Sequence, residues 1–520
     1  MARIVLALLL IPSAWFAWTW RHMPRAGEYH DDAIYYVSAQ SLVETGEYRI
    51  TSLPSQPKQT KYPPLWPAVL SLAWLSGPYP DNLPVAMLLC WLMVPATLVL
   101  FHTWLRREGF AEWATVGVCV LWALNPYIQL FSTTMLSELP FLAAVLASML
   151  VLHNSTPRQA LAAGALAGLA FLTRSAGIAM LPAALVWLWF RQERRQAVYF
   201  AAGMAPAIIG WAAWCALNKN SSQDWLALYY TNYIGFHLRN FVWSETHLFL
   251  WKNLDGIIHG LGSYVLPNVN PTLPEKILAQ TFAVAGIIGV TRLLRRRSRE
   301  LTGLYAGFAV LLALMLAVWH FPPNERFMLP AAPLWLAGFW TEMTHLAANI
   351  RATLRHKDRS QRIAAAGFGA LAAACLGFCA WKMGDVSLSL LPSAYAIEEQ
   401  RLRLSQPVMD WMRANLPADA RVMSEKDPIL YLRAGVRGAG RFPPTIYWYR
   451  EEFGKLRDLY IDMPRFAREL GFTHIYLSDW DYSRDVTDEA HIAILAGLKK
   501  HPRLELLHES GQSRVYRILQ

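Results

Sequence analysis

Two adjacent carboxylates, Asp31 and Asp32, follow the first hydrophobic run of the chain, which ends at Trp20. They lie in the stretch "GEYHDDAIYYVSAQSLVETGEY". An ionised carboxylate can accept the proton of a hydroxyl group while that oxygen forms a new bond. An unperturbed Asp has a pKa of roughly 4 and is ionised at neutral pH. Both are candidate catalytic residues: Asp31 is the predicted general base, and Asp32 either orients the loop or is simply a first-turn acid of a helix.

Three basic residues lie near the ends of apolar runs: Lys61, Arg174 and Arg326. A cation in a poorly solvated place can bind an anionic group such as a phosphate, and arginine can do so with two parallel hydrogen bonds. The two prolines after Tyr62 restrict the backbone and would fix Lys61 in place. Each cation could instead be an anchor whose charge reaches the membrane interface.

Glu138, Tyr62, His30 and His320 are further candidates near the same place. Glu138 could contact an acceptor, hold a divalent cation with Asp31, or pair with an arginine. Tyr62 and His320 are candidate acceptor or metal contacts, and His30 could join a metal site, although lone histidines at an interface more often have no such role. The five cysteines lie in apolar runs, and no Cys/His spacing of a metal site exists. No cofactor is therefore assigned, and a divalent cation stays an open alternative.

The chain that holds these residues has the composition of a membrane protein. It is 54% hydrophobic and only 16% charged, whereas a soluble protein carries about a quarter charged residues. Much of the net charge of +11 lies in short clusters between apolar runs, which indicates membrane topology rather than nucleic-acid binding. We predict a polytopic all-α membrane domain of about eleven transmembrane helices. They are expected at residues 3–20, 83–105, 112–131, 138–153, 160–174, 175–190, 197–217, 277–293, 301–319, 327–347 and 363–382.

One short apolar run, residues 65–75, decides the topology. It is bracketed by prolines and is short for a span. If it does not cross, all the later arginine clusters lie on one side of the membrane, which the positive-inside rule makes cytoplasmic. We therefore predict a juxtamembrane or re-entrant helix here.

The non-cytoplasmic face then collects the candidate residues. It holds the first external loop 21–82, a long aromatic loop 218–276, and the span ends with Glu138, Arg174 and Arg326. His237 and Arg239 lie in the aromatic loop and are candidate acceptor contacts, although the membrane interface alone explains the aromatic residues. Rare charges at span ends on one face predict one site at the outer membrane–water boundary.

The C-terminal segment, residues 383–520 and here called the tail, has a different pattern. Charge rises, and helical and strand periodicities alternate. We predict a transmembrane catalytic domain over residues 1–382 and an external soluble α/β domain with a mostly parallel sheet over residues 383–520. The tail has no dinucleotide, P-loop or nucleophile-elbow motif. It is therefore interpreted as a docking or acceptor-orienting domain.

Several of these stretches resemble a known family. "DDAIYYVSAQSLVETGEY" followed by "KYPPLWPAVL" is similar to the first external loop of GT-C glycosyltransferases, in the branch of protein O-mannosyltransferases and lipid A aminoarabinose transferases. "SELPF", "FLTRSAGIAMLPAALVWL" and "ERFMLPAAPLWLAG" resemble later landmarks in the same order, so the resemblance covers about residues 1–350. Two positions depart from the family pattern: the usual second Glu is Asp32, and the usual Tyr after the last arginine is Phe327.

The resemblance implies a membrane enzyme that transfers a sugar from a polyprenyl-phosphate donor to an acceptor hydroxyl on the non-cytoplasmic face, with the first acid, Asp31, as base. Because the lipid phosphate is a good leaving group, one carboxylate suffices and direct displacement inverts the sugar carbon. Lys61, Arg174 and Arg326 would then bind the donor phosphate. The expected partners are this donor, a lipid, glycan or protein acceptor and membrane lipids, with no nucleic acid. The expected place is a bacterial inner membrane, with the site and the tail in the periplasm.

Two other classes of function compete with this interpretation. A transporter or flippase of a lipid-linked sugar should show repeat symmetry and charges near the midplane, whereas no repeat is visible and the charges lie at outer span ends. A non-catalytic scaffold would tolerate Asp31→Asn but not loss of the tail. We favour the enzyme.

Overall fold

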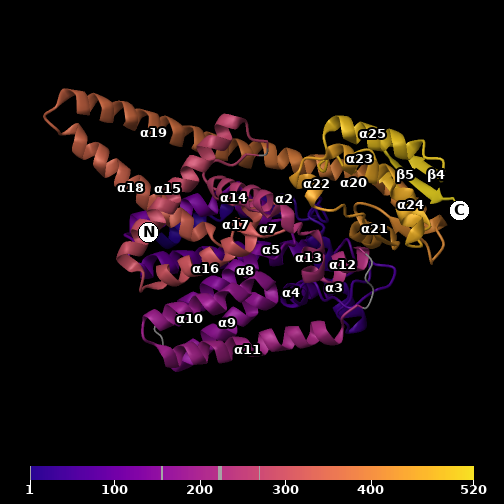
Figure 1. Cartoon of the computed structure of the whole chain (residues 1–520), viewed down its shortest axis with the longest axis horizontal. Coiled ribbons are helices and arrows are strands. Elements are labelled where there is room, and N and C mark those ends of the chain that lie inside the picture. Colours follow the sequence, from indigo (N-terminus) through magenta and orange to yellow (C-terminus); the bar gives the residue numbers. More distant parts are fainter. Residues whose placement is uncertain (1, 154–155, 221–224, 269, 520) are drawn as a thin grey trace.

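Apolar runs become helices here because a backbone inside a bilayer must satisfy its own hydrogen bonds. The computed structural model describes residues 2–153, 156–220, 225–268 and 270–519 (Figure 1). Residues 221–224 and 269 of the expected aromatic loop therefore lie outside the described part. The helices up to the middle of the chain are α1 (Ala2–Leu8), α2 (Ile11–Thr19), α3 (Asp31–Thr45), α4 (Leu65–Trp74), α5 (Leu83–Arg107), α6 (Glu112–Ala123), α7 (Pro126–Ser132), α8 (Glu138–Leu152), α9 (Pro157–Thr173), the 3-10 turn η1 (Ser175–Ala179) and α10 (Met180–Phe190).

The helices of the second half of the membrane body pack against those of the first half. Its elements are α11 (Arg194–Leu217), α12 (Trp225–Thr231), α13 (Tyr233–Asn240), the 3-10 turn η2 (Trp243–Glu245), α14 (Thr246–Gly262), α15 (Leu273–Arg297), α16 (Leu301–Ala317), α17 (Glu325–Met328), α18 (Ala332–Leu354) and α19 (Arg359–Asp385). Helix α11 packs along α9, and α15 packs along α18. One hydrophobic core runs through this body from Leu9 to Cys379 and extends to Leu391 and Tyr395 of the segment that follows.

Among the described helices, four are long and apolar enough to cross a membrane: α5, α11, α15 and a continuous helix from Arg359 to Asn415. A further pair, α6 and α7, is bent by 58°. The bend follows from Pro126, which starts α7, and from Asn125, whose side chain accepts a hydrogen bond from the Tyr127 N–H. All eleven predicted runs are helical, but the others are shorter, broken or less apolar. Helix length therefore does not establish a count of about eleven spans.

Helix α4 covers the short apolar run, residues 65–75, whose placement decides the predicted membrane topology. Its 10 residues span roughly 15 Å, about half the thickness of a hydrocarbon core. It packs between α3 and α5. These are the dimensions of the juxtamembrane or re-entrant helix predicted from the sequence.

The tail folds around one five-stranded sheet of order β2-β1-β3-β5-β4. Its elements are the π-helical turn η3 (Val386–Leu390), α20 (Leu391–Asn415), β1 (Arg421–Met423), α21 (Asp427–Ala434), β2 (Arg437–Ala439), α22 (Ile446–Tyr449), α23 (Phe453–Ile461), α24 (Met463–Glu469), β3 (His474–Ser478), α25 (Asp488–Lys499), β4 (Leu504–Ser510) and β5 (Ser513–Ile518). The expected mostly parallel sheet is wrong. Strand β1 is parallel to β2 and β3, but β5 is antiparallel to both β3 and β4. The reason is the tight turn at Gly511, with φ +58°, which folds β4 and β5 into a hairpin.

The tail is joined to the membrane body by a continuous helix. Helices α19, η3 and α20 form one 57-residue helix, so the predicted boundary between residues 382 and 383 falls inside it. Figure 1 shows α19 running along the edge of the body into α20, with the sheet at the opposite end of the molecule from the N-terminus. A second hydrophobic cluster includes Tyr35, Tyr62 and Tyr229 from the loops and Tyr460 from the tail. The tail is thus packed onto the segments 21–82 and 218–276.

Candidate active site

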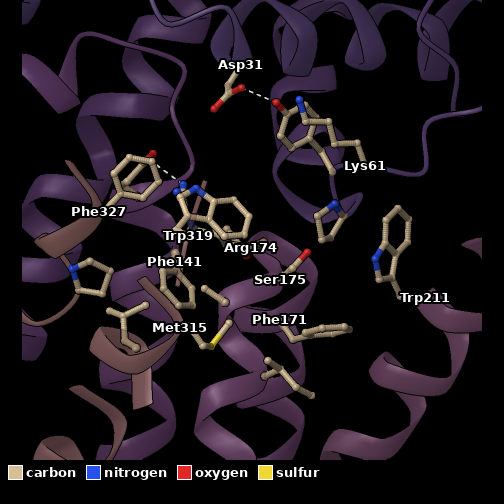
Figure 2. A pocket seen from close by; sticks show the side chains of 18 of the residues that line it. Asp31, Lys61, Phe141, Phe171, Arg174, Ser175, Trp211, Met315, Trp319 and Phe327 are labelled. Atoms are coloured by element: carbon tan, nitrogen blue, oxygen red, sulfur yellow. Dashed lines mark hydrogen bonds and ion pairs between the residues drawn. The ribbon is translucent and has the colours of Figure 1, made fainter. Parts of the chain in front are cut away.

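A cavity of about 530 Å³ opens beside the start of α3 and the segment just before α4. Asp31, Lys61 and Arg174 lie at one end, and Phe171 and Met315 line the other (Figure 2). Most of the remaining lining is apolar. The cavity is therefore suited to a molecule with an anionic head and an apolar body.

Asp31 begins α3 and points its carboxylate into the charged end of the cavity. The Tyr62 hydroxyl donates a hydrogen bond to Asp31 Oδ1, and Arg326 Nη2 donates to Asp31 Oδ2 at 2.7 Å. Burial alone would raise the pKa of Asp31, but Arg326, Lys61 and the hydrogen bond from Tyr62 hold it well below its usual range. Asp31 is thus ionised, and 21% of its side chain is exposed.

The residue before this carboxylate has an uncommon backbone. His30 has φ +59° and ψ −49°, and the Asp31 N–H donates to the Tyr29 carbonyl at 2.6 Å. This is a γ-turn of the rare positive-φ kind. Such a conformation costs about 1–3 kcal/mol and persists only where surrounding contacts hold it. The backbone conformation at the start of α3 therefore depends on the residues that contact His30.

Asp32 faces a different environment from Asp31. Its side chain is fully buried, and it lies outside the cavity lining formed by the described residues. Oδ2 accepts a hydrogen bond from the Gly27 N–H at 2.8 Å. Burial raises the pKa of Asp32 to about 6. Its geometry is that of a residue that closes the turn before α3, in line with the loop-orienting alternative.

An ion network joins Asp31 to the other side of the cavity. Arg326 contacts Asp31 with Nη2 and donates from Nε to Glu138 Oε1. Arg174 Nη1 donates to the same Glu138 oxygen at 2.7 Å. Glu138 is 1% exposed, which two guanidinium groups make tolerable. Of the alternatives expected for Glu138, the observed contact is the pairing with arginine.

Lys61 completes the charged end of the cavity. Its Nζ lies 3.8 Å from the centroid of the Tyr229 ring, and the Gln59 side chain accepts its backbone N–H at 2.9 Å. Burial lowers the pKa of Lys61 to about 8. Together with Arg174 and Arg326 it gives three cations against two carboxylates, so an excess positive charge faces the cavity.

The histidines and Arg239 divide into two groups. His237 lines the cavity, and its Nδ1 lies 2.8 Å from Nδ1 of the fully buried His320. Burial lowers the pKa of both rings. His30 points instead to the tail, with Nε2 3.0 Å from Asp427 Oδ1. Arg239 is exposed and lies outside the described cavity lining.

The contacts of Asp31 and Glu138 bear on the predicted alternative of a divalent cation held between them. Within the described residues, no group of three or more His, Cys, Asp and Glu could hold a metal ion. Asp31 and Glu138 are near each other, but Arg326 bridges them. A divalent cation shared by both carboxylates would have to displace that guanidinium.

Sequence reasoning missed several cavity residues. Tyr35 lies one helical turn after Asp31 and bonds to Ser137 Oγ at 3.3 Å. Helical spacing of four residues could have indicated it. Trp211 and Trp319 also line the cavity, but nothing in their local sequence separates them from the many interface aromatics.

With the geometry in place, comparison with solved structures defines the class of fold. It is that of ArnT from Cupriavidus metallidurans, an aminoarabinose transferase of the GT-C class. The structure of ArnT bound to undecaprenyl phosphate matches with a TM-score of 0.58 and 13% identity, over 98% of this chain and 97% of that chain. The apo structure matches with a TM-score of 0.51 and 11% identity, over 94% and 93%. Neither a protein-family model nor a curated protein matches the sequence. The GT-C, ArnT-like fold predicted from the motifs is thereby confirmed.

Proposed function

We propose that this chain is an integral-membrane glycosyltransferase that moves a sugar from a polyprenyl-phosphate donor to an acceptor hydroxyl on the non-cytoplasmic face. The observation that carries the proposal is the cavity, which places an excess of positive charge at one end of an apolar volume. A lipid-linked sugar phosphate has the matching distribution of charge and apolar surface. The ArnT neighbour bound to undecaprenyl phosphate supports a donor of this kind.

Asp31 is the proposed base. The acceptor oxygen attacks the sugar carbon from the side opposite the phosphate, its proton passes to Asp31, and the carbon–oxygen bond to the phosphate breaks with inversion. In the observed state Arg326 and Tyr62 make Asp31 a weak base. A donor phosphate that draws Arg326 toward itself would loosen the Arg326–Asp31 pair and raise the basicity of Asp31. Donor binding and activation of the base would thus be linked.

Lys61, Arg174 and Arg326 are the proposed phosphate-binding residues. The donor phosphate is a diester with one negative charge, and its release as a monoester adds a second. Cations already positioned where that charge develops stabilise the transition state more than the ground state. The three observed cations at the cavity end meet this requirement.

We propose the topology that the charge pattern predicts: about eleven spans, with residues 1–382 as the membrane domain and the tail outside. Contacts between the arginine-rich helix ends support a single cytoplasmic face. Arg191 donates to the Arg299 carbonyl, and Arg297 lies 5.6 Å from the centre of the Phe110 ring. The place we infer is a bacterial inner membrane, with the site and the tail in the periplasm.

The acceptor is a hydroxyl of a lipid, a glycan or a protein. His237 lines the cavity beside Trp319, and we propose it as an acceptor contact. Tyr62 orients Asp31 rather than binding the acceptor, because its hydroxyl already donates to that carboxylate.

The test is a paired assay on purified protein in lipid. Wild type and Asp31→Asn would each receive a panel of polyprenyl-phosphate hexoses and pentoses, with a membrane extract of the source organism as acceptor. Transfer by wild type that is lost in the folded variant supports the proposal and identifies the donor. Equal transfer by both proteins would overturn Asp31 as base. Donor movement across sealed vesicles without transfer would instead indicate a flippase.

A further inference from the structure

Helix α21 of the tail packs against the turn, residues 27–30, that precedes Asp31. Gly27 has φ +87°, and a Cβ added there would lie 2.2 Å from Cγ1 of Ile429. Three residues later, His30 Nε2 lies 3.0 Å from Asp427 Oδ1, and the Asp427 side chain is fully buried. Both tail residues belong to α21. The γ-turn before Asp31 is therefore held from the tail side.

A second contact from the tail reaches the residue beneath Lys61. Phe442 follows β2 and stacks on Tyr229, with ring centroids 3.5 Å apart and an interplanar angle of 14°. Tyr229 also contacts Lys61, whose Nζ lies 3.8 Å from the centre of the same ring. Attraction between an ammonium group and a ring requires the ring to stay in place below the charge. Phe442 thus fixes the surface on which Lys61 rests.

We propose that the tail is a positioning unit for the membrane site, in which Asp427 holds Asp31 through His30 and Phe442 holds Lys61 through Tyr229. This inference rests on the proposed function. Asp427 and Phe442 are positioning residues, because each acts through a neighbour. The two routes touch where the Phe442 ring packs edge-on against His30, with centroids 5.2 Å apart. They end at groups with different tasks, so the first should act mainly on the chemical step and the second mainly on donor affinity.

The experiment uses the full-length protein in lipid nanodiscs, with the sugar donor that gives wild-type turnover and with undecaprenyl phosphate as a binding probe. Asp427→Ala should lower kcat by about tenfold to a hundredfold, because small misplacement of a catalytic group has effects of this size. Its Kd for undecaprenyl phosphate should stay within about twofold. Phe442→Ala should raise that Kd by about threefold to tenfold, whereas Phe442→Tyr, which keeps a ring, should restore wild-type binding.

The matched control is Glu451→Gln. Glu451 of the tail pairs with Lys252 of α14 at 2.6 Å, and both side chains are exposed. This variant removes a tail-to-body contact away from Asp31, so kcat and Kd should not change. His30→Ala combined with Asp427→Ala should be little worse than His30→Ala alone, because loss of the His30 ring already breaks the link to Asp427.

Each result bears on the inference. Asp427→Ala with wild-type kcat would overturn it, and so would a loss of kcat that Glu451→Gln reproduces. Additive effects of His30→Ala and Asp427→Ala would also overturn the proposed route. Wild-type protein that binds undecaprenyl phosphate but transfers no sugar would overturn the proposed function, and this inference with it. Asp427→Asn, which keeps the size and a hydrogen-bonding oxygen, should recover most of the lost kcat and separates positioning from misfolding.

Discussion

At the residue scale, the acid pair shows how one turn can give two neighbouring carboxylates opposite properties. Asp31 contacts Arg326 and the Tyr62 hydroxyl, so its charged form is stabilised. Asp32 is fully buried, and this burial penalises its charged form more than the hydrogen bond from the Gly27 amide stabilises it. The chemistry we assign to the pair therefore belongs to Asp31, and Asp32 acts on the fold.

Asp32→Asn should stabilise the protein at pH 8 and change little near pH 4. The pKa of Asp32 rises from 3.8 to about 6 on folding, so its stabilising contribution is complete below pH 4 and is lost as the pH rises through 6. A pKa change of this size corresponds to about 2–3 kcal/mol, and Asn carries no charge to penalise. Thermal unfolding of both proteins at pH 4.5, 6 and 8 measures the effect. A variant that is destabilised equally at all three values would contradict it.

The loss of activity at alkaline pH should result from deprotonation of Lys61. Burial lowers the pKa of Lys61 to about 8, so free enzyme loses this positive charge as the pH rises past that value. We expect kcat/KM for the donor to fall above pH 8, since this ratio reports ionisation of the free enzyme. Lys61→Arg keeps its charge throughout this range and should hold kcat/KM level to pH 9.5. If both proteins lose activity together, the loss comes from another group.

At the element scale, the start of α3 and the segment just before α4 carry the charged end of the cavity. Trp66 of α4 donates from its indole nitrogen to the Met135 carbonyl at 2.7 Å, and Trp74 donates to the Tyr36 carbonyl of α3 at 3.0 Å. These bonds place Lys61, four residues before α4, opposite Asp31 at the start of α3. In the proposed topology, a helix this short keeps both its ends on one side of the membrane.

Single cysteines should therefore report the same side on both flanks of α4. In a background without the five native cysteines, Ser55→Cys and Asp81→Cys should react with a membrane-impermeant maleimide in intact spheroplasts, because both positions are exposed. Arg195→Cys, exposed in the first turn of α11, should react only after permeabilisation. Labelling of Ser55→Cys without Asp81→Cys would show that α4 crosses and that the later arginine clusters lie outside.

Which features of this structure can be predicted from the sequence depends on how far apart in sequence the interacting residues are. Span ends can be assigned to one face from arginine positions alone, and so Glu138, Arg174 and Arg326 could be expected near Asp31. Their pairing could not, because Arg326 and Asp31 are 295 residues apart in sequence and meet only through tertiary packing. The His30–Asp427 contact joins residues 397 apart and has no local signal either.

At the scale of the whole molecule, the membrane body lines the cavity and the tail packs on the segments beside its charged end. The apolar end of the cavity lies among α9, α11 and α16, and the charged end lies under loops that the tail covers. A donor with its chain in the bilayer and its phosphate at the surface fits this arrangement. The continuous helix from Arg359 to Asn415 joins the membrane body to the tail.

Filling the apolar end should therefore block the lipid without touching the charged end. Ala212 of α11 lines the cavity and its neighbour Ala213 does not belong to the described lining, although both are exposed. A ligand at a hundredfold excess over its Kd stabilises a protein by about 2.7 kcal/mol, so undecaprenyl phosphate should raise the Tm of wild type. Ala212→Trp should lose most of this rise, and Ala213→Trp, which adds the same side chain one residue along α11, should keep it. Equal Tm shifts in the two variants would mean that the carrier lipid lies outside this cavity, and the assignment of the donor's apolar chain to it would be wrong.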